Sequence, residues 1–287
     1  MSGRTGPEPG KPQTERVKRM NRTGPSRILS IMTAASYILM VTVNALANIL
    51  PINGVNTGQV SDAYPNLFAP AGVTFSIWGV IYILLGIHVL YQLGLFRDKG
   101  LAAHRTGPET LARLFILSSL ANAVWIFAWH FGLIGLSLIL MLVILVCLIL
   151  ISLMTRPETM TPRERFMVRL PFSVYFGWIT VATIANVTTW LVSLGWQGFG
   201  IPETTWTVLV IGTGLLIGIS TMLTRRDAAY GLVLIWAYGG IYLKHTSAEG
   251  FSGMYPPVIT MVLACLALLV AAEAWLLISG NRSRYRM

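Results

Sequence analysis

Long apolar segments, separated by short polar ones, dominate the hydropathy pattern of the chain. A helix needs about 20 mainly apolar residues to cross the hydrocarbon layer of a membrane. Eight segments meet this requirement: residues 28–50, 73–96, 111–131, 133–154, 168–195, 205–223, 228–246 and 257–279. The pattern therefore predicts an all-α fold, a polytopic transmembrane helical bundle of about eight spans.

The composition agrees with this interpretation. The chain has 287 residues, of which 54% are hydrophobic and 11% are charged, whereas soluble domains carry about 25% charged residues. An ordinary soluble enzyme and a disordered chain are both excluded. The two cysteines, Cys147 and Cys265, are too few for a disulfide scaffold and lie in apolar surroundings, so we expect them to be unreactive. We find no catalytic triad, phosphate-binding loop or metal-ligand spacing, and we predict neither an enzyme nor a metal site.

The positive charges indicate the orientation of the spans. With eight spans, 20 of the 21 Lys and Arg residues fall on one side of the membrane, and Lys244 alone falls on the other. Basic loops remain in the cytoplasm, so we predict a cell-membrane protein with both termini cytoplasmic. This distribution accounts for the net charge of +10 without a nucleic-acid partner. Residues 1–26 are predicted to form a disordered basic cytoplasmic tail that contacts anionic lipid. Cleavage of the first span as a signal peptide, after Ala45-Leu46-Ala47, is the alternative.

Aromatic and amide side chains recur in the predicted outer half of four spans. Asn122 and Trp125 are spaced i,i+3, and Trp178 and Asn186 are spaced i,i+8, so each pair lies on one helix face. An amide in hydrocarbon is costly unless it is hydrogen-bonded. Hydrogen bonding between helices with an interfacial aromatic belt is one interpretation, and a ligand cavity is the other. The candidate ligand-binding residues are Trp78, Tyr82, Asn122, Trp125, Trp178 and Asn186.

Four motifs carry a resemblance to a known family. They are Pro65-Asn66-Leu67-Phe68-Ala69-Pro70-Ala71-Gly72, Phe75-Ser76-Ile77-Trp78 with Tyr82, Asn122-Ala123-Val124-Trp125, and Tyr175-Phe176-Gly177-Trp178 followed by Ala182 and Asn186. Together they resemble the TspO/MBR family of tryptophan-rich sensory and translocator proteins. The resemblance covers residues 27–195 and implies a five-helix core. Residues 196–287 would then add three transmembrane helices and a basic cytoplasmic tail. The sequence departs from the family pattern at Pro70-Ala71, where paired prolines are usual, and at Val174, which replaces a proline.

The resemblance implies a function as well as a fold. It implies that a tetrapyrrole, sterol or similar amphipathic molecule binds in a bundle cavity, beneath a lid formed by residues 51–72. We expect a sensor or receptor for such a molecule. A transporter, which could be proton-coupled, and a porphyrin-modifying enzyme are the alternatives. The Pro, Gly and Asn residues of the lid predict a loop without regular structure. The expected partners are the hydrophobic ligand and membrane lipid, a homodimer is left open, and no cofactor is expected apart from a tetrapyrrole ligand.

Ionisable residues within spans are candidates for function. Glu273 lies about two turns from the cytoplasmic edge of the last span, and His88 lies at a similar depth on the second. A Glu273–His88 pair is a candidate proton site, with interfacial solvation as the alternative. Lys244 lies too near the outer interface for a retinal-binding lysine, and we expect it to extend into the interface.

Overall fold

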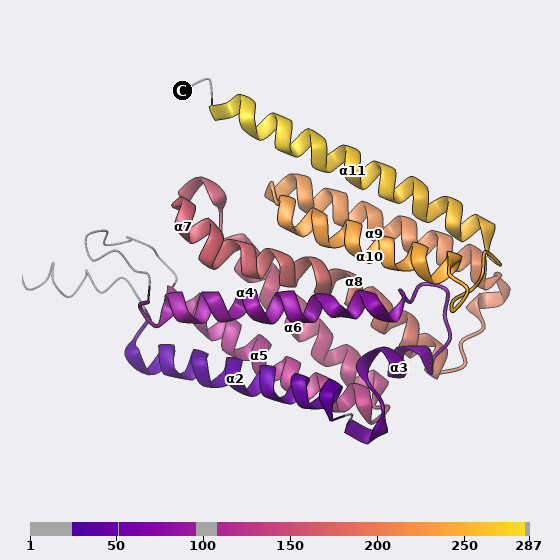
Figure 1. Cartoon of the computed structure of the whole chain (residues 1–287), viewed down its shortest axis with the longest axis horizontal. Coiled ribbons are helices and arrows are strands. Elements are labelled where there is room, and N and C mark those ends of the chain that lie inside the picture. The colour runs from indigo at the N-terminus through magenta and orange to yellow at the C-terminus, as the bar shows by residue number, and fades with distance from the viewer. Residues whose placement is uncertain (1–24, 51, 96–107, 285–287) are drawn as a thin grey trace, which may run out of the picture.

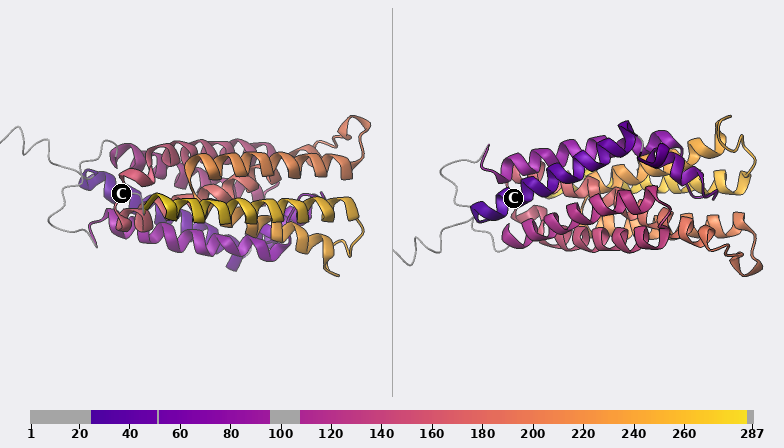
Figure 2. Two further views of the ribbon diagram at one scale, coloured as in Figure 1. Left: turned by 90° about the horizontal axis from the view of Figure 1, so that it is seen from above. Right: turned by 90° about the horizontal axis from the view of Figure 1, so that it is seen from below.

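The computed structural model describes residues 25–50, 52–95 and 108–284, in which all the regular elements are helical. The long helices are α2 Arg27–Ile49, α4 Ile77–Gln92, α5 Pro108–His130, α6 Ile134–Met154, α8 Leu170–Ser193, α9 Glu203–Arg225, α10 Ala228–Thr246 and α11 Pro256–Arg284. The short elements are η1 Ile52–Gly54, α3 Thr57–Asp62, η2 Gly72–Ser76, η3 Pro157–Thr159, α7 Pro162–Glu164, the π-helical turn η4 Arg165–Arg169, and η5 Gly198–Gly200. The long helices run along one axis in a single bundle (Figures 1 and 2). The predicted all-α fold is confirmed.

Seven of the eight predicted spans correspond to helices that are long and apolar enough to cross a membrane. The other, α10, has 19 residues but falls short in hydropathy. Its position accounts for this difference, because α10 packs against α8, α9 and α11 and buries polar side chains such as Tyr230 and His245 against protein. A helix that packs on three other helices and exposes one face does not need the uniformly apolar surface that lipid requires.

Neighbouring helices connect the two halves of the chain into one bundle. In the first half, α2 packs on α5, α5 on α6, and α6 on α8, while α4 lies against α2 and α8. In the second half, α10 packs directly on α8, and α11 packs on α9 and α10. Figure 1 shows α2 and α11 at opposite edges of the bundle. The last three helices are therefore in direct contact with the first five.

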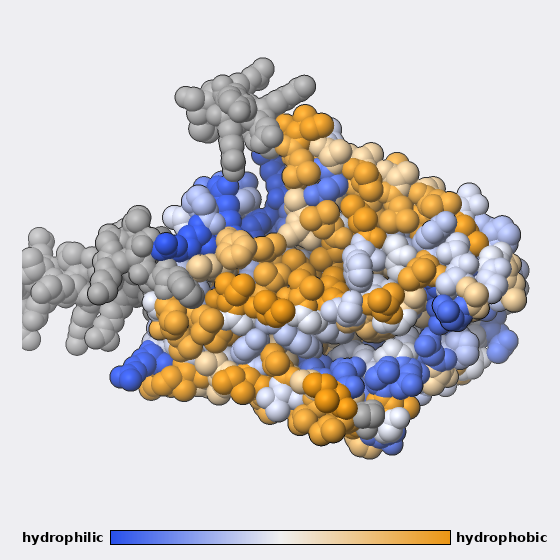
Figure 3. Space-filling model, viewed as in Figure 1, coloured by the Kyte–Doolittle hydropathy of each residue, from blue (hydrophilic) through white to orange (hydrophobic). Residues whose placement is uncertain are grey.

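The surface of the bundle is that of a multi-pass membrane protein. Large apolar side chains point outward along the spans, among them Ile83, Ile139 and Leu216, which are 68%, 60% and 72% exposed. Figure 3 shows apolar residues over the middle of the bundle and hydrophilic ones toward its two ends. The described parts of the five segments predicted to face the cytoplasm all lie at one end, since successive long helices are antiparallel (Figure 1). Most of the predicted tail, residues 1–24, lies outside the described part of the chain.

The loop between the first two spans is more regular than expected. Residues 57–62 form helix α3, and residues 72–76 form a 3-10 turn that leads into α4. Asn56 begins α3 with a capping box: its Oδ1 accepts from the backbone N–H of Gln59 at 2.9 Å, and Gln59 Oε1 accepts from the N–H of Asn56 at 2.8 Å. The prediction of a loop without regular structure is wrong, because the asparagine that suggested a turn caps a helix instead.

Candidate functional site

Five aromatic side chains from α4, α5 and α8 form one buried group, which we call the aromatic cluster: Trp78, Tyr82, Trp125, Tyr175 and Trp178. The Trp78 ring is at its centre. It stacks on Tyr82 with 5.6 Å between ring centroids, and its centroid lies 5.9 Å from that of Trp125, 6.0 Å from Tyr175 and 6.2 Å from Trp178. The structure thus brings together all four of the aromatic residues that the sequence suggested, and adds Tyr175.

A chain of buried hydrogen bonds lies beside the aromatic cluster. Asn44 Nδ2 donates to Asn122 Oδ1 at 2.8 Å, and Asn122 Nδ2 donates to the Tyr175 hydroxyl at 3.0 Å. The three residues come from α2, α5 and α8, and all are at least 96% buried. Asn122, a candidate ligand-binding residue from the sequence, therefore links α2, α5 and α8 by hydrogen bonds. It also fixes the orientation of the Tyr175 ring in the aromatic cluster.

A cavity of about 610 Å³ opens between α2, α3 and α4. Its lining includes Asn44, Asn48, Gln59, Phe75, Trp78 and Tyr82. Trp78 and Tyr82 form its aromatic wall, whereas Trp125 and Trp178 lie behind Trp78 and support it. Three buried donors of the aromatic cluster have no hydrogen-bond acceptor among the described residues: the Tyr82 hydroxyl and the indole N–H groups of Trp125 and Trp178. The Tyr82 hydroxyl is itself buried, so Tyr82 contributes its ring rather than its hydroxyl to the cavity wall.

Asn186 lies apart from this cavity. Its Oδ1 accepts from the Ser137 hydroxyl at 3.1 Å, between α6 and α8. It is eight residues beyond Trp178, about 12 Å along α8. The i,i+8 spacing places Trp178 and Asn186 on one face of α8. Trp178 meets Trp78 on α4, whereas Asn186, farther along the helix, meets Ser137 on α6. Asn186 is therefore not among the residues that line the cavity.

The loop that lines one side of the cavity is attached to α5 on one side. The Trp129 indole donates to the carbonyl of Thr57 at 3.1 Å, and His130 Nδ1 lies 3.0 Å from the carbonyl of Ile52. Asn53 Nδ2 donates to the carbonyl of His130 at 3.0 Å. Trp129 also stacks on Trp125, with 5.8 Å between centroids. The end of α5 therefore holds the start of the loop and connects it to the aromatic cluster.

On its other side the loop is attached to α10. The backbone N–H of Ala71 donates to the carbonyl of Gly240 at 3.0 Å, and the Trp236 indole donates to the carbonyl of Thr74 at 3.0 Å. Lys244 Nζ lies 2.8 Å from Asp62 Oδ1, and His245 Nε2 lies 2.8 Å from the carbonyl of Leu67. Lys244 thus forms an ion pair with the loop. These contacts join segments more than 160 residues apart, and no motif or spacing in the sequence predicts them.

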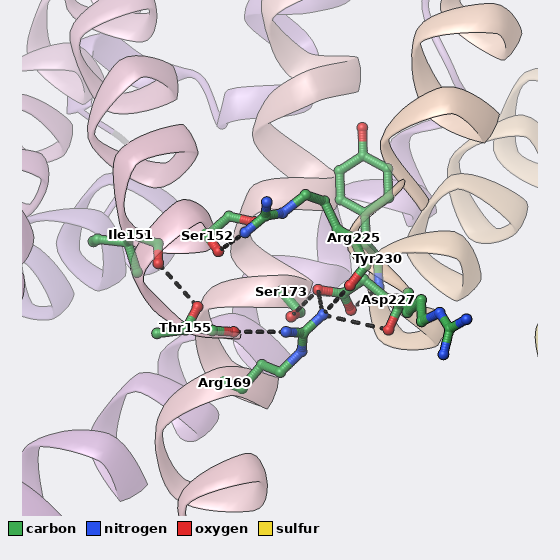
Figure 4. A network of polar contacts seen from close by, with 9 residues as sticks. Ile151, Ser152, Thr155, Arg169, Ser173, Arg225, Asp227 and Tyr230 are labelled. Carbon is green, nitrogen blue, oxygen red and sulfur yellow. Dashed lines mark hydrogen bonds and ion pairs between the residues drawn. The ribbon is translucent and has the colours of Figure 1, made fainter. Parts of the chain in front are cut away.

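A second polar site lies at the opposite end of the bundle, where α6, α8 and the α9–α10 turn meet (Figure 4). Arg169 donates to the carbonyl of Thr155 at 2.6 Å, to that of Arg225 at 2.7 Å, and to Asp227 Oδ2 at 3.1 Å. The Ser173 hydroxyl donates to the same carboxylate oxygen at 2.6 Å. Arg169 and Asp227 are both more than 90% buried. This network joins the last three helices to the first five.

The structure does not bring Glu273 and His88 together. His88 Nδ1 lies 3.2 Å from the carbonyl of Met167, and its ring packs on Phe115 and Phe172. Neither His88 Nε2 nor either Glu273 oxygen has a hydrogen-bond partner among the described residues, so no hydrogen bond links the two side chains. Counting residues along each span estimated a similar depth for His88 and Glu273. It could not tell which side of the bundle each residue faces.

These features define a multi-pass helical membrane protein with a buried aromatic cluster and a cavity lined in part by the first loop. The family model described as TSPO-like protein matches residues 30–275, and the chain belongs to this family. The predicted resemblance is confirmed, and the match extends beyond residue 195 through α9, α10 and most of α11. No curated protein and no solved structure was found to match the chain.

Proposed function

We propose that this protein binds a flat hydrophobic or amphipathic molecule, of tetrapyrrole or sterol type, in the cavity between α2, α3 and α4, and that it acts as a sensor or receptor. The observation that carries the proposal is the aromatic wall of Trp78 stacked on Tyr82, in a cavity of about 610 Å³. This volume is within the range of about 300–1,000 Å³ for small-molecule sites. A flat ligand would stack on Trp78.

The polar groups of the cavity suit an amphipathic ligand. Asn44 and Asn48 line it from α2, and Gln59 and Asp62 line it from α3. The carboxamide of Gln59 is exposed at the cavity, so its Nε2 would donate to a polar group of the ligand. Apolar walls with a few polar groups of this kind bind a molecule and fix its orientation.

Transport and enzymatic turnover are the alternative functions. Transport of the ligand is favoured by the intramembrane carboxyl of Glu273, and uptake into vesicles that responds to a pH gradient would support it. Enzymatic modification of a porphyrin needs an acid–base pair at the cavity. The carboxylate among the lining residues is that of Asp62, which is paired with Lys244, so we favour binding over turnover.

Replacement of Trp78 by alanine should weaken tetrapyrrole binding by about 1–3 kcal/mol, the usual cost of removing a buried aromatic contact. The probe is protoporphyrin IX, and its affinity is measured from its absorbance change with purified protein in detergent. Trp275→Ala is the matched control, since Trp275 is 60% exposed on α11 and should leave affinity unchanged. Both variants are first shown to be folded by thermal unfolding. Equal affinities in Trp78→Ala and the wild type would contradict the proposed site.

We further propose that the protein lies in the cell membrane with both termini in the cytoplasm, on the strength of the asymmetry in basic residues. Glu158 and Glu249 are exposed at opposite ends of the bundle, while Cys147 and Cys265 are buried. In intact cells, a membrane-impermeant maleimide should label Glu249→Cys at once and Glu158→Cys only after permeabilisation. The reverse pattern would show that the orientation is inverted.

A further inference from the structure

The carboxyl of Glu273 occupies an unusual position between the last three helices. The side chain is 94% buried, and neither oxygen has a hydrogen-bond partner among the described residues. It lies against α10 at Gly231, where any side-chain carbon would overlap Glu273 Oε2 and the sulfur of Met222 on α9. The glycine thus leaves the space that the carboxyl occupies.

The charged groups nearest to Glu273 do not neutralise it. Its main neighbours are α9 and α10. From the turn between them, Asp227 is close enough to act on it electrostatically, and like charges repel. Among the side chains that the structure describes, the cations of this region are used elsewhere or lie outside, because Arg169 pairs with Asp227, Arg225 donates to Ser152, and Arg226 is exposed.

The uncharged groups around Glu273 offer no compensation either. From α10, the Tyr230 hydroxyl donates to Thr180 Oγ1 on α8 at 3.2 Å. From α9, Met222 presents a thioether, which is no hydrogen-bond donor. An ionised carboxylate that is buried without a donor or a cation is very unfavourable, whereas the neutral acid costs far less. The surroundings of Glu273 therefore suit its protonated form.

We propose that Glu273 is a membrane-embedded proton-binding site, which holds a proton in the resting protein and exchanges it at the Arg169–Asp227 end of the bundle. Asp227 precedes Gly231 by one turn of α10 and marks the direction of that end. The bound proton stays on the carboxyl as an O–H and leaves as the carboxylate forms. This site is separate from the cavity between α2, α3 and α4, and it does not depend on the ligand proposed there.

Infrared spectroscopy of the purified wild type and of Glu273→Gln, titrated from neutral to alkaline pH, tests the site directly. The wild type should show the C=O stretch of a protonated carboxyl at neutral pH, and this band should be lost at alkaline pH. It should be absent from Glu273→Gln, which keeps the shape of the side chain. Glu249→Gln is the control, because Glu249 is exposed on the α10–α11 loop and its replacement should leave the band unchanged. Identical spectra for the wild type and Glu273→Gln would overturn the proposal.

A second measurement needs no variant. A hydrophobic carbodiimide attacks protonated carboxyls, and mass spectrometry locates the adduct. The wild type should be modified at Glu273 at neutral pH, and the modification should be lost at alkaline pH. Adducts confined to exposed carboxyls, such as that of Glu249, would overturn the proposal. Neither experiment involves a tetrapyrrole, so failure here and failure of the proposed ligand site are distinguishable.

Discussion

Asp227→Ala should lower the free energy of unfolding by about 3–5 kcal/mol, because it leaves the Arg169 guanidinium buried without its carboxylate. The side chain of Asp227 is 7% exposed and that of Arg169 is 10% exposed, so water cannot replace the missing partner. Two further contacts would be lost. Asp227 Oδ2 accepts from the Ser173 hydroxyl, and its Oδ1 accepts from the N–H of Tyr230 in the first turn of α10. A lost cap of this kind costs about 1 kcal/mol.

The matched control for this change is an exposed ion pair within one helix. Arg113 and Glu109 are 3.1 Å apart, with side chains 71% and 52% exposed, and Arg113→Ala should change stability by less than about 0.5 kcal/mol. Reversible unfolding in mixed micelles, followed by circular dichroism, compares the two variants. A loss in Asp227→Ala no larger than that in Arg113→Ala would show that the network does not hold the two halves of the bundle together.

Gly240→Leu should destabilise the protein by about 1–3 kcal/mol, the range for forcing extra carbon atoms into a packed core. A side-chain carbon at Gly240 would overlap the side chain of Thr74, so α10 and η2 would have to separate. The hydrogen bond from Ala71 to the carbonyl of Gly240 would then lengthen. Because η2 leads into Trp78, this separation should also weaken protoporphyrin IX binding.

The adjacent glycine provides the control. A carbon atom at Gly239 would meet no atom within 4 Å, and glycine is a poor helix former, so Gly239→Leu should be neutral or slightly stabilising. Thermal unfolding and porphyrin absorbance, measured on both variants, separate the two positions. If Gly239→Leu and Gly240→Leu behave alike, the contact between α10 and the loop does not support the cavity.

The sequence predicted the long helices well because lipid imposes a simple requirement on each of them, a length of apolar residues. It was less informative where protein replaces lipid. Helix α10 falls below the hydropathy of a span because most of its surface packs on α8, α9 and α11, and α3 begins at the capping residue Asn56 within a loop. The depth of His88 and Glu273 along their spans could be estimated from the sequence. Their contacts depend also on the rotation and position of each helix in the bundle, and these cannot be read from depth alone.

The same distinction applies to the candidate site. The sequence placed Trp78, Trp125 and Trp178 in the same half of the membrane on three different helices, and their rings lie near one another. It could not show that Asn44 and Tyr175 belong to a hydrogen-bond chain through three helices. Nor could it show that Asn186 contacts α6 rather than the cavity.

The attachment of the cavity loop to both α5 and α10 has a consequence for binding thermodynamics. A loop that must become ordered around its ligand pays conformational entropy at the moment of binding, and this reduces affinity. Here the indoles of Trp129 and Trp236, together with the Lys244–Asp62 ion pair, hold the loop in place through contacts within the protein. The loop therefore loses its conformational entropy when the chain folds. Contact energy with the aromatic wall can therefore appear almost entirely as affinity, as in a preorganised receptor.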